Sequence, residues 1–376
     1  MSGEVLDCGL AGRCGGCPWA GRSLHDQRAE RLGELGRLWR AVGLDLGVLE
    51  RAVVHGVGLA GLRDRVDLGL VRGPEGAALG LRELGGRAVL DVQSCPMLSA
   101  ELQSWVDDLR ADLPPVSLAS LRLRVGPQGQ RGLWLDMANT EIKALLDEGA
   151  WLARRLAAGA VVELGQRHRA VVSAQGQVRL GEPQLHPWFQ TWVGEDERPA
   201  PLYSAVASFS QPGFACNRAL VRRVRAAVRA AAVPSWVEIG CGSGNLTLPL
   251  AAEVEQVLAL DVDALALAGL ARGLAASGLE DRVRVERASL ASPHLPWLEG
   301  ASGALLDPPR SGLGPAVGAL LQRRPQAIVY VSCHGPSMVE DLGRLAAGGY
   351  AVVSLEGVDQ FPHTPHGEWV MRLSLG

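Results

Sequence analysis

Residues 235–245 read SWVEIGCGSGN, an apolar segment of strand character that runs directly into a glycine-rich turn. Downstream, apolar segments of strand length alternate with segments of helical periodicity, and an arginine-flanked helix is predicted just upstream, over 217–232. The strand-like segments are QVLALD (256–261), VRVERA (283–288), GALLD (303–307), AIVYVSC (327–333), YAVVSL (350–355) and EWVMRLSL (368–375). This alternation predicts a doubly wound α/β domain with a predominantly parallel sheet, in which ligands bind beyond the carboxyl ends of the strands.

The glycine-rich turn is a candidate cofactor loop. Gly240, Gly242 and Gly244 allow a tight turn and a close approach of a ligand to the backbone. The next strand ends in Asp261, and an acid at that position can accept hydrogen bonds from ribose hydroxyls. Asn245 stands where the dinucleotide pattern G-x-G-x-x-G has its third glycine, so the loop looks more like the S-adenosylmethionine loop of Rossmann-like methyltransferases. A nicotinamide dinucleotide loop and a plain strand-to-helix turn are the alternatives.

Three later segments place acid or thiol groups near the ends of predicted strands. The segments are DPPRSG (307–312), VSCHGPSM (331–338) and DQFPHTPHGEWV (359–370). They contribute Asp307, Cys333 and Glu368, and we expect these three side chains at one rim of the sheet, beside the cofactor loop. Each also has a purely structural explanation: Asp307 could cap a turn, Cys333 could be a buried strand-end cysteine, and Glu368 could be a surface residue.

The N-terminus is rich in cysteine and glycine. Of the seven cysteines, Cys8, Cys14 and Cys17 follow the spacing C-x5-C-x2-C, and Cys95 could complete a set of four thiolates. An odd number of cysteines in a chain without a predicted export signal argues against a disulfide framework. Four thiolates suit tetrahedral zinc or an iron–sulfur cluster, and the spacing does not choose between them. The alternative is three loop thiols and one core cysteine.

The composition excludes several classes of protein. Of the 376 residues, 47% are hydrophobic and 20% charged, which favours a packed core over disorder. No uninterrupted apolar stretch reaches the ~18 residues of a membrane span, and the N-terminus lacks the apolar run of a secretory signal. The formal net charge of −3 predicts weak non-specific binding to polyanions. A cytoplasmic protein that does not associate with membranes is therefore expected.

The sequence also predicts an order of domains. The expected domains are 1–113, 114–200 and 201–376. The first contains the cysteines, a surface helix over 20–45 and a short antiparallel sheet within 61–92. The second is a small α+β domain with a helix over about 139–156 and a break in regular structure at 198–201. Its predicted strands are LRLRV (121–125), GLWLDM (132–137) and AVVELG (160–165).

In combination, these motifs resemble those of the RNA uracil-5-methyltransferase family over nearly the whole chain. The matching pieces, in the family's order and spacing, are the N-terminal cysteines, SFSQ (208–211) before a helix, EIGCGSGN (238–245), DPPRSG, the SC nucleophile strand and FPHTPHGE (361–368). The outline is most similar to short bacterial 23S rRNA uracil-5-methyltransferases without the N-terminal oligonucleotide-binding barrel of some members. The resemblance implies a Rossmann-like methyltransferase domain that uses S-adenosyl-L-methionine, RNA recognition by 114–200, and a four-iron, four-sulfur (4Fe-4S) cluster on the four cysteines.

The resemblance also implies a role for each site residue. Cys333 is the nucleophile that adds to C6 of uracil, Glu368 is the base that removes the C5 proton, and Asp307 lies between the cofactor and the uracil edge. The cofactor-contacting positions are Gln211, Gly240, Asn245, Asp261 and Asp307. RNA is the expected partner, ribosomal rather than transfer RNA, and the protein is expected to be a monomer. The competing hypotheses are a transfer RNA enzyme, an amino-group methyltransferase, whose usual N-P-P-Y is D-P-P-R here, and a non-catalytic RNA-binding protein.

Overall fold

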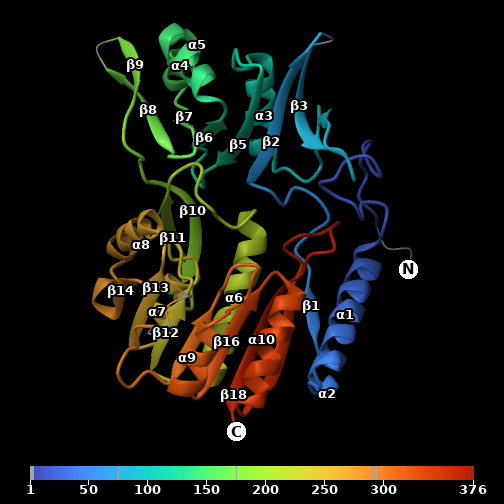
Figure 1. The fold of residues 1–376 in the computed structure, drawn as a ribbon, viewed down its shortest axis with the longest axis vertical. Coiled ribbons are helices and arrows are strands. Elements are labelled where there is room, and N and C mark those ends of the chain that lie inside the picture. Colours follow the sequence, from blue (N-terminus) through green and yellow to red (C-terminus); the bar gives the residue numbers. More distant parts are fainter. Residues whose placement is uncertain (1–3, 75, 175, 290–291, 293–294) are drawn as a thin grey trace. The chain divides into compact units, whose positions relative to one another are not determined.

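The computed structural model describes residues 4–74, 76–174, 176–289, 292 and 295–376. The chain forms two compact units, each made of segments that are not consecutive in the sequence (Figure 1). Unit 1 consists of Met1–Ser23, Gly58–Phe189 and Ser204–Phe214, and unit 2 of Leu24–Val57, Gln190–Tyr203 and Ala215–Gly376. The predicted domains, with boundaries at 113/114 and 200/201, are continuous stretches of sequence. Each of the two units instead combines three separate segments.

Unit 2 is built on an eight-stranded sheet with the order β1-β17-β18-β16-β15-β12-β13-β14. The strands are β1 (Val53–His55), β12 (Ser235–Ile239), β13 (Gln256–Asp261), β14 (Val283–Arg287), β15 (Gly303–Leu306), β16 (Ala327–Ser332), β17 (Tyr350–Val358) and β18 (Glu368–Leu375). Only β18 among these strands runs antiparallel to its neighbours, β16 and β17. The predicted doubly wound α/β class is confirmed, with β1 as an edge strand that the sequence did not indicate.

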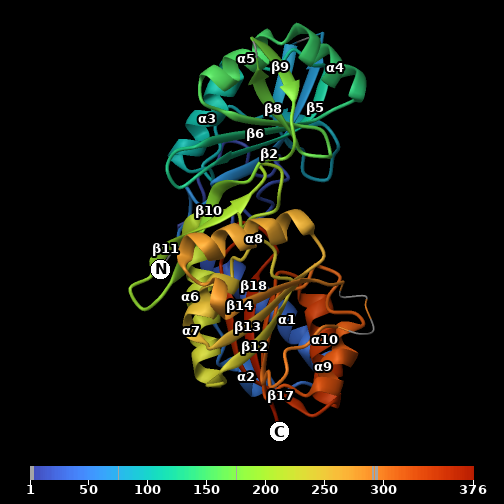
Figure 2. The same cartoon turned by 90° about the vertical axis from the view of Figure 1, so that its left-hand side faces the viewer.

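Helices cover both faces of this sheet (Figure 2). They are α1 (Leu24–Ala41), α2 (Leu46–Glu50), α6 (Phe214–Ala231), α7 (Thr247–Glu253), α8 (Ala264–Ser277), the 3-10 turn Glu280–Arg282, α9 (Ala316–Arg323) and α10 (Gly335–Ala347). One face packs against α1, α9 and α10 through a continuous apolar core that includes Trp39, Leu320 and Leu342. On the opposite side of the sheet lie α6 and α7. Among the described residues, none of the helices combines the length and apolar content needed to cross a membrane.

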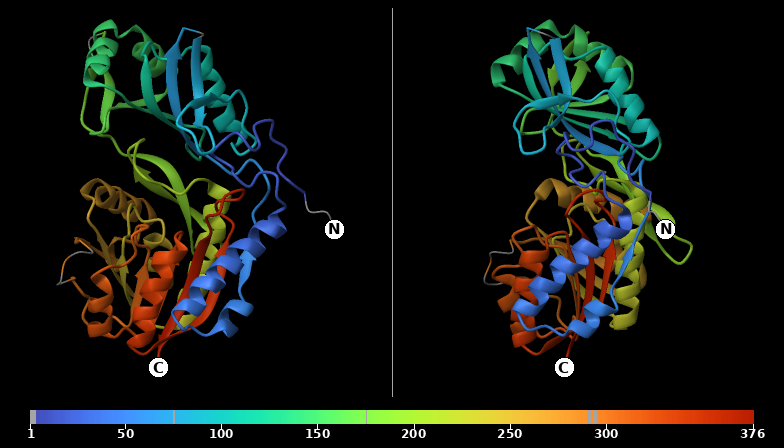
Figure 3. Two further views of the ribbon diagram at one scale, coloured as in Figure 1. Left: turned by 45° about the vertical axis from the view of Figure 1, so that its right-hand side comes forward. Right: turned by 90° about the vertical axis from the view of Figure 1, so that its right-hand side faces the viewer.

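The predicted surface helix, α1, is exposed on one face only. It packs alongside α10, as both views of Figure 3 show, and buries Leu35 and Trp39 in the core. The Trp39 indole N–H donates to the carbonyl of Asp45 at 2.9 Å, which fixes the start of the following turn. The same face buries the polar side chains of Gln27 and Arg31. The expected surface helix is therefore present, and its buried face packs against core residues that include partners more than 250 residues away.

Unit 1 contains a second eight-stranded sheet, with the order β4-β3-β2-β5-β6-β7-β8-β9. Its strands are β2 (Arg65–Gly73), β3 (Gly76–Arg82), β4 (Val89–Asp91), β5 (Leu118–Val125), β6 (Arg131–Asp136), β7 (Val161–Leu164), β8 (Arg169–Ala174) and β9 (Gln177–Leu180), and its helices are α3 (Ala100–Ala111), α4 (Asn139–Glu148) and α5 (Ala150–Ala157). Neighbouring strands are antiparallel except β6 and β7. The predicted antiparallel sheet within 61–92 is present, and it continues through the segment expected to form a separate domain.

Two local predictions in this region were wrong. The single helix expected over 139–156 is interrupted at Gly149, whose φ of 62° ends α4 and allows α5 to start in a new direction. The break expected at 198–201 is instead the start of β11 (Arg198–Ser204), which pairs with β10 (His186–Val193) in a two-stranded ribbon. Prolines are tolerated there because each strand of a two-stranded ribbon has one edge that forms no ladder hydrogen bonds.

Candidate active site

The glycine loop of unit 2 is shaped by a close approach to the end of a neighbouring strand. Gly240 has a φ of 84°, and a Cβ atom at this position would lie 2.5 Å from the carbonyl oxygen of Asp307. The backbone N–H of Asp307 donates to the carbonyl of Ile239 at 3.1 Å, so the two strand ends are held together directly. A side chain at position 240 would separate them. Glycine is therefore required here for both conformation and space.

Asp261 holds the other side of this loop. One carboxylate oxygen accepts from the N–H of Gly242 at 2.8 Å, and the second accepts from the N–H of Asp263 at 2.9 Å. Each carboxylate oxygen has two acceptor sites, so these bonds leave capacity for a ligand hydroxyl. The predicted ribose acceptor thus also sets the shape of the glycine loop.

Asn245, which was predicted to contact the cofactor, is hydrogen-bonded to a buried amide. Its side chain exchanges two hydrogen bonds with Asn217 of α6, at 2.7 and 2.8 Å. Its backbone carbonyl accepts from the Thr191 hydroxyl at 2.8 Å. Asn217 and Thr191 are site residues that the sequence analysis missed. A polar residue at the start of the predicted helix over 217–232 was the available signal for Asn217.

Three acids crowd the rim where β12, β13 and β15 end. Burial, together with the charge of Asp261, raises the pKa of Asp307 to about 7. Burial raises the pKa of Glu238, the penultimate residue of β12, to about 8, with further contributions from Asp307 and Asp261. An acceptor-rich rim can bind hydroxyl and ammonium groups of a ligand.

Strand register brings the predicted nucleophile and base together. Ser332, the last residue of β16, pairs with Trp369 of antiparallel β18. Cys333 follows the first of these residues and Glu368 precedes the second, so both lie at the same end of the two adjacent strands. Cys333 is half-buried, and burial followed by the charge of Glu368 raises the pKa of its thiol, while a hydrogen bond and the charge of Arg310 oppose this rise. Cys333 and Glu368 therefore lie at one rim of the unit 2 sheet, as predicted.

Glu368 itself is buried, and a second acid, Asp307, lies near it. Burial, and then the charge of Asp307, raise the pKa of Glu368 well above its ordinary value. The side-chain amide of Gln360 donates to one carboxylate oxygen of Glu368 at 3.3 Å. A raised pKa makes the ionised carboxylate a stronger base, which suits a group that takes a proton from a weakly acidic carbon. The sequence analysis assigned no role to Gln360.

Gln211, the remaining predicted cofactor contact, belongs to unit 1. It is buried within the segment Ser204–Phe214, which side chains of the unit 1 sheet hold in place. The carboxylate of Glu163 accepts from the backbone N–H groups of Val206 and Ala207 at 2.7 and 3.0 Å. Arg124 donates to the carbonyl of Val206 at 3.3 Å. Within the SFSQ motif itself, Arg122 donates to the backbone carbonyl of Ser208 at 3.2 Å and Arg124 donates to the side-chain hydroxyl of Ser210 at 3.1 Å.

The four predicted metal-binding cysteines share one small cavity in unit 1. Cys8, Cys14, Cys17 and Cys95 all line it, together with apolar side chains such as Leu81. All four are free thiols, and burial, followed by the charge of Cys95, raises the pKa of Cys17 to about 12. Across the described residues, no three histidine, cysteine or acidic side chains are close enough to hold one metal ion. The donor set and its apolar walls nevertheless suit a group that binds thiolates.

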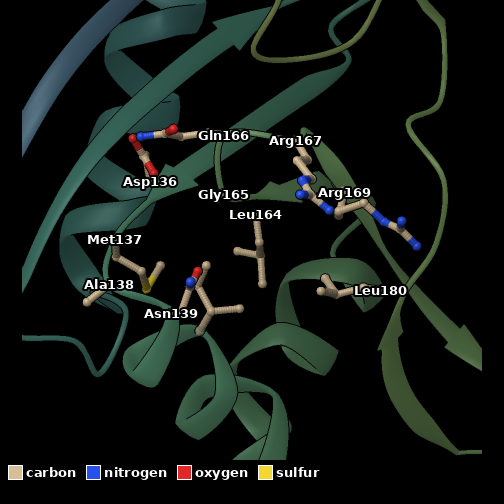
Figure 4. Close-up of a pocket in the computed structure, with 11 residues that line it drawn as sticks. Asp136, Met137, Ala138, Asn139, Leu164, Gly165, Gln166, Arg167, Arg169 and Leu180 are labelled. Atoms are coloured by element: carbon tan, nitrogen blue, oxygen red, sulfur yellow. The ribbon is translucent and has the colours of Figure 1, made fainter.

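A second, larger cavity in unit 1 has a volume of about 780 Å³ (Figure 4). Its apolar side is formed by Met137, Ile142, Leu164 and Leu180, and polar side chains, among them Asn139, Gln166, Arg167 and Arg169, line it as well. Arg169 is fixed by Gly181 and Glu182, at 2.6 and 3.1 Å, whereas Arg167 is exposed. The sequence analysis did not single out these residues.

Comparisons with known proteins find similarity to RNA methyltransferases. A family model described as tRNA (uracil-5-)-methyltransferase matches residues 300–374. An uncharacterized RNA methyltransferase of Bdellovibrio bacteriovorus is 38% identical over 97% of this chain and 94% of its own length. The 23S rRNA (uracil(1939)-C(5))-methyltransferase RlmD of Chromohalobacter salexigens is 29% identical over 98% of this chain and 75% of its own.

The fold has a solved counterpart. The tRNA (uracil-54, C5)-methyltransferase of Pyrococcus abyssi, crystallised with S-adenosyl-L-homocysteine, superposes with a TM-score of 0.64 at 20% identity. The match covers 91% of this chain and 82% of that structure, and confirms the Rossmann-like methyltransferase fold.

Proposed function

The chain belongs to the RNA uracil-5-methyltransferase family, and we propose that it methylates C5 of one uridine in 23S ribosomal RNA through a covalent bond between Cys333 and the base. S-adenosylmethionine-dependent methylation of RNA uracil follows from the family. The covalent step, the target RNA and the roles of single residues are the proposal. The observation that carries it is the β16–β18 register, which aligns Cys333 with Glu368 at the rim beside the glycine loop.

The chemistry requires both groups. Uracil C5 is a poor nucleophile until a thiolate adds to C6 and converts the ring into an enolate. S-adenosylmethionine, when bound, would supply an electrophilic methyl group: C5 of the Cys333-linked ring would bond to the methyl carbon as its bond to sulfur breaks, leaving S-adenosylhomocysteine. Glu368 then removes the C5 proton, and the electron pair expels the Cys333 thiolate from C6. Arg310 stabilises that thiolate before addition and after release.

The cofactor roles follow the loop geometry. We assign the ribose hydroxyls to Asp261 and the cofactor side of the uracil edge to Asp307, with Gly240 leaving room for the ligand. Asn245 contributes by fixing the end of the loop through Asn217 rather than by a free side chain. Gln211 is assigned as a cofactor contact on the resemblance of SFSQ alone.

Ribosomal RNA is favoured over transfer RNA because relatives that align with nearly the whole chain are named for 23S rRNA. We infer that unit 1, which includes most of the predicted recognition segment 114–200, binds this RNA. The large cavity supports the inference, since apolar walls with amide and guanidinium groups suit an unpaired nucleotide. Mapping the 5-methyluridine that disappears from cellular RNA when the gene is deleted tests the target directly.

We further propose that Cys8, Cys14, Cys17 and Cys95 hold a 4Fe-4S cluster. The support is their shared cavity and the resemblance of their spacing to cluster-bearing family members. When bound, the cluster would tie residue 8 to residue 95 and stabilise this part of unit 1.

Replacing Asp261 tests the cofactor assignment. Asp261→Ala should weaken S-adenosylmethionine binding by about 1.5–3 kcal/mol, because a charged acceptor is lost and the loop loses its anchor at Gly242. Calorimetry gives the affinity. The matched control is Asp263→Ala, which removes the N-cap of α8 but no ligand contact; equal affinities of the wild type and Asp261→Ala would contradict the assignment.

Replacing Cys333 and Glu368 separates the two chemical stages. Cys333→Ala should abolish both methylation and any protein–RNA adduct. Glu368→Gln should instead accumulate an adduct that survives denaturing electrophoresis and carries the labelled methyl group, because addition and methyl transfer proceed while deprotonation stalls. Normal turnover by Glu368→Gln, or an adduct formed by Cys333→Ala, would show that other residues perform these steps.

Anaerobic purification tests the metal assignment. The protein should be brown and contain about four irons per chain, and Cys95→Ser should lose them. Cys216→Ala, which removes a buried thiol outside the cavity, should keep the iron. A colourless protein with one zinc ion would contradict the cluster.

Arg167→Ala tests the RNA cavity. The loss of one phosphate-contacting cation should weaken RNA binding and reduce the slope of log affinity against log salt by about 1. Fluorescence anisotropy over a salt series measures both. Arg154→Ala removes the same charge from α5, where it already pairs with Asp112 at 3.0 Å; identical slopes for the two variants would speak against this cavity.

A further inference from the structure

A buried hydrogen-bond network connects α1 to the segment 359–367, which immediately precedes Glu368. This segment joins β17 to β18, and the pairing of Val358 with Glu368 closes it at its base. Its conformation is set by side chains of α1, more than 300 residues earlier in the chain. Residues 24–41 lie outside the part of the chain that matches the family model, 300–374.

Gln27 fixes the middle of the segment. Its side-chain carbonyl accepts from the backbone N–H of His363 at 2.7 Å, and its amide nitrogen lies 3.1 Å from Nδ1 of the same residue. Both side chains are fully buried. His363 has a φ of 65°, which is uncommon for a residue other than glycine and persists only where surrounding contacts impose it. Gln27 provides two such contacts.

Arg31 holds the same segment at three points. Its guanidinium donates to Asp359 at 2.8 Å, to the carbonyl of Phe361 at 3.2 Å, and to the carbonyl of Thr364 at 2.8 and 3.1 Å. The Arg31 and Asp359 side chains are almost completely buried. A planar guanidinium with five donors can satisfy these acceptors together, whereas an ammonium group cannot.

The segment in turn contacts the base. Gln360, between two residues held by Arg31, donates to the carboxylate of Glu368 at 3.3 Å. The N–H of Asp359 also donates to the carbonyl of His55 in β1, so the start of the segment is fixed to the sheet edge. A shift of the segment would therefore move both Gln360 and Glu368. Displacements of about 1 Å in a catalytic group can cost on the order of 100-fold in rate.

We propose that Gln27 and Arg31 are positioning residues that set the orientation of Glu368 for removal of the C5 proton. This inference rests on the proposed function, because it presumes Glu368 as the base. It predicts a selective defect: addition of Cys333 and methyl transfer continue, while proton removal and release of the methylated RNA slow down. A helix that merely stabilised the fold would slow all steps together or lower the fraction of active protein.

The test uses the full-length protein, RNA with tritium at uridine C5, and S-adenosylmethionine with a ¹⁴C methyl group. Arg31→Lys keeps the charge but loses the fork geometry, and Gln27→Leu removes the contacts with His363 at similar volume. In single-turnover reactions each variant should transfer the methyl group at a rate within about twofold of the wild type and release tritium about 10–100-fold more slowly. The methylated adduct should accumulate meanwhile, and KM for the cofactor should stay unchanged.

Arg37→Lys is the matched control, since Arg37 lies on the exposed face of α1 with 66% of its side chain accessible; it should behave as the wild type. If Arg31→Lys fails to fold, Gln27→Leu still tests the inference. Tritium release at the wild-type rate, or equal slowing of methyl transfer and tritium release, would overturn it. Failure of the proposed function has a different signature: wild-type protein would methylate no uridine, or Glu368→Gln would trap no adduct.

Discussion

The antiparallel pairing of β18 between β16 and β17 is the constraint on which the site depends. The other strands of this sheet end at one rim, so a residue at the end of a strand lies there and a residue at the start does not. Because β18 runs in the opposite direction, its first residue, Glu368, lies at the same rim as Cys333. Cys333 and Glu368 become neighbours through backbone hydrogen bonds between strands, which hold the two positions more rigidly than a loop would.

Acids concentrated at this rim oppose folding and favour function. Glu238, Asp307 and Glu368 are all held in surroundings that raise their pKa values, and each ionised form is disfavoured by burial. A sequence selected only for stability would not collect three such groups around a glycine loop. Their presence is explained by ligands that bring hydroxyl and ammonium groups, and by a reaction that needs a carboxyl able to take up a proton.

The catalytic motifs occupy the last quarter of the chain, yet their support comes from elsewhere. Unit 2 includes Leu24–Val57, which adds β1 to the sheet edge and packs α1 beside α10. Through Gln27 and Arg31 this N-terminal segment contacts the residues that lead into Glu368. The segment that carries Gln211 is likewise held by Glu163 and Arg124 of unit 1, which no motif marks. Residues with no chemistry of their own thus decide where the reacting groups lie.

The amino-acid sequence alone determined the α/β class, the seven strands β12 to β18, and the grouping of Cys333, Glu368 and Asp307 at one rim. These follow from local information: apolar strands of regular spacing, glycines in a turn, and motifs whose order is fixed by the chain. Tertiary structure alone decided which face of α1 is buried, the amide pair of Asn245 with Asn217, and the inclusion of Pro199 and Pro201 in a strand. Each of these depends on a partner far away in the sequence. The residues around a hydrogen-bonding or buried side chain do not indicate which distant residue it will contact.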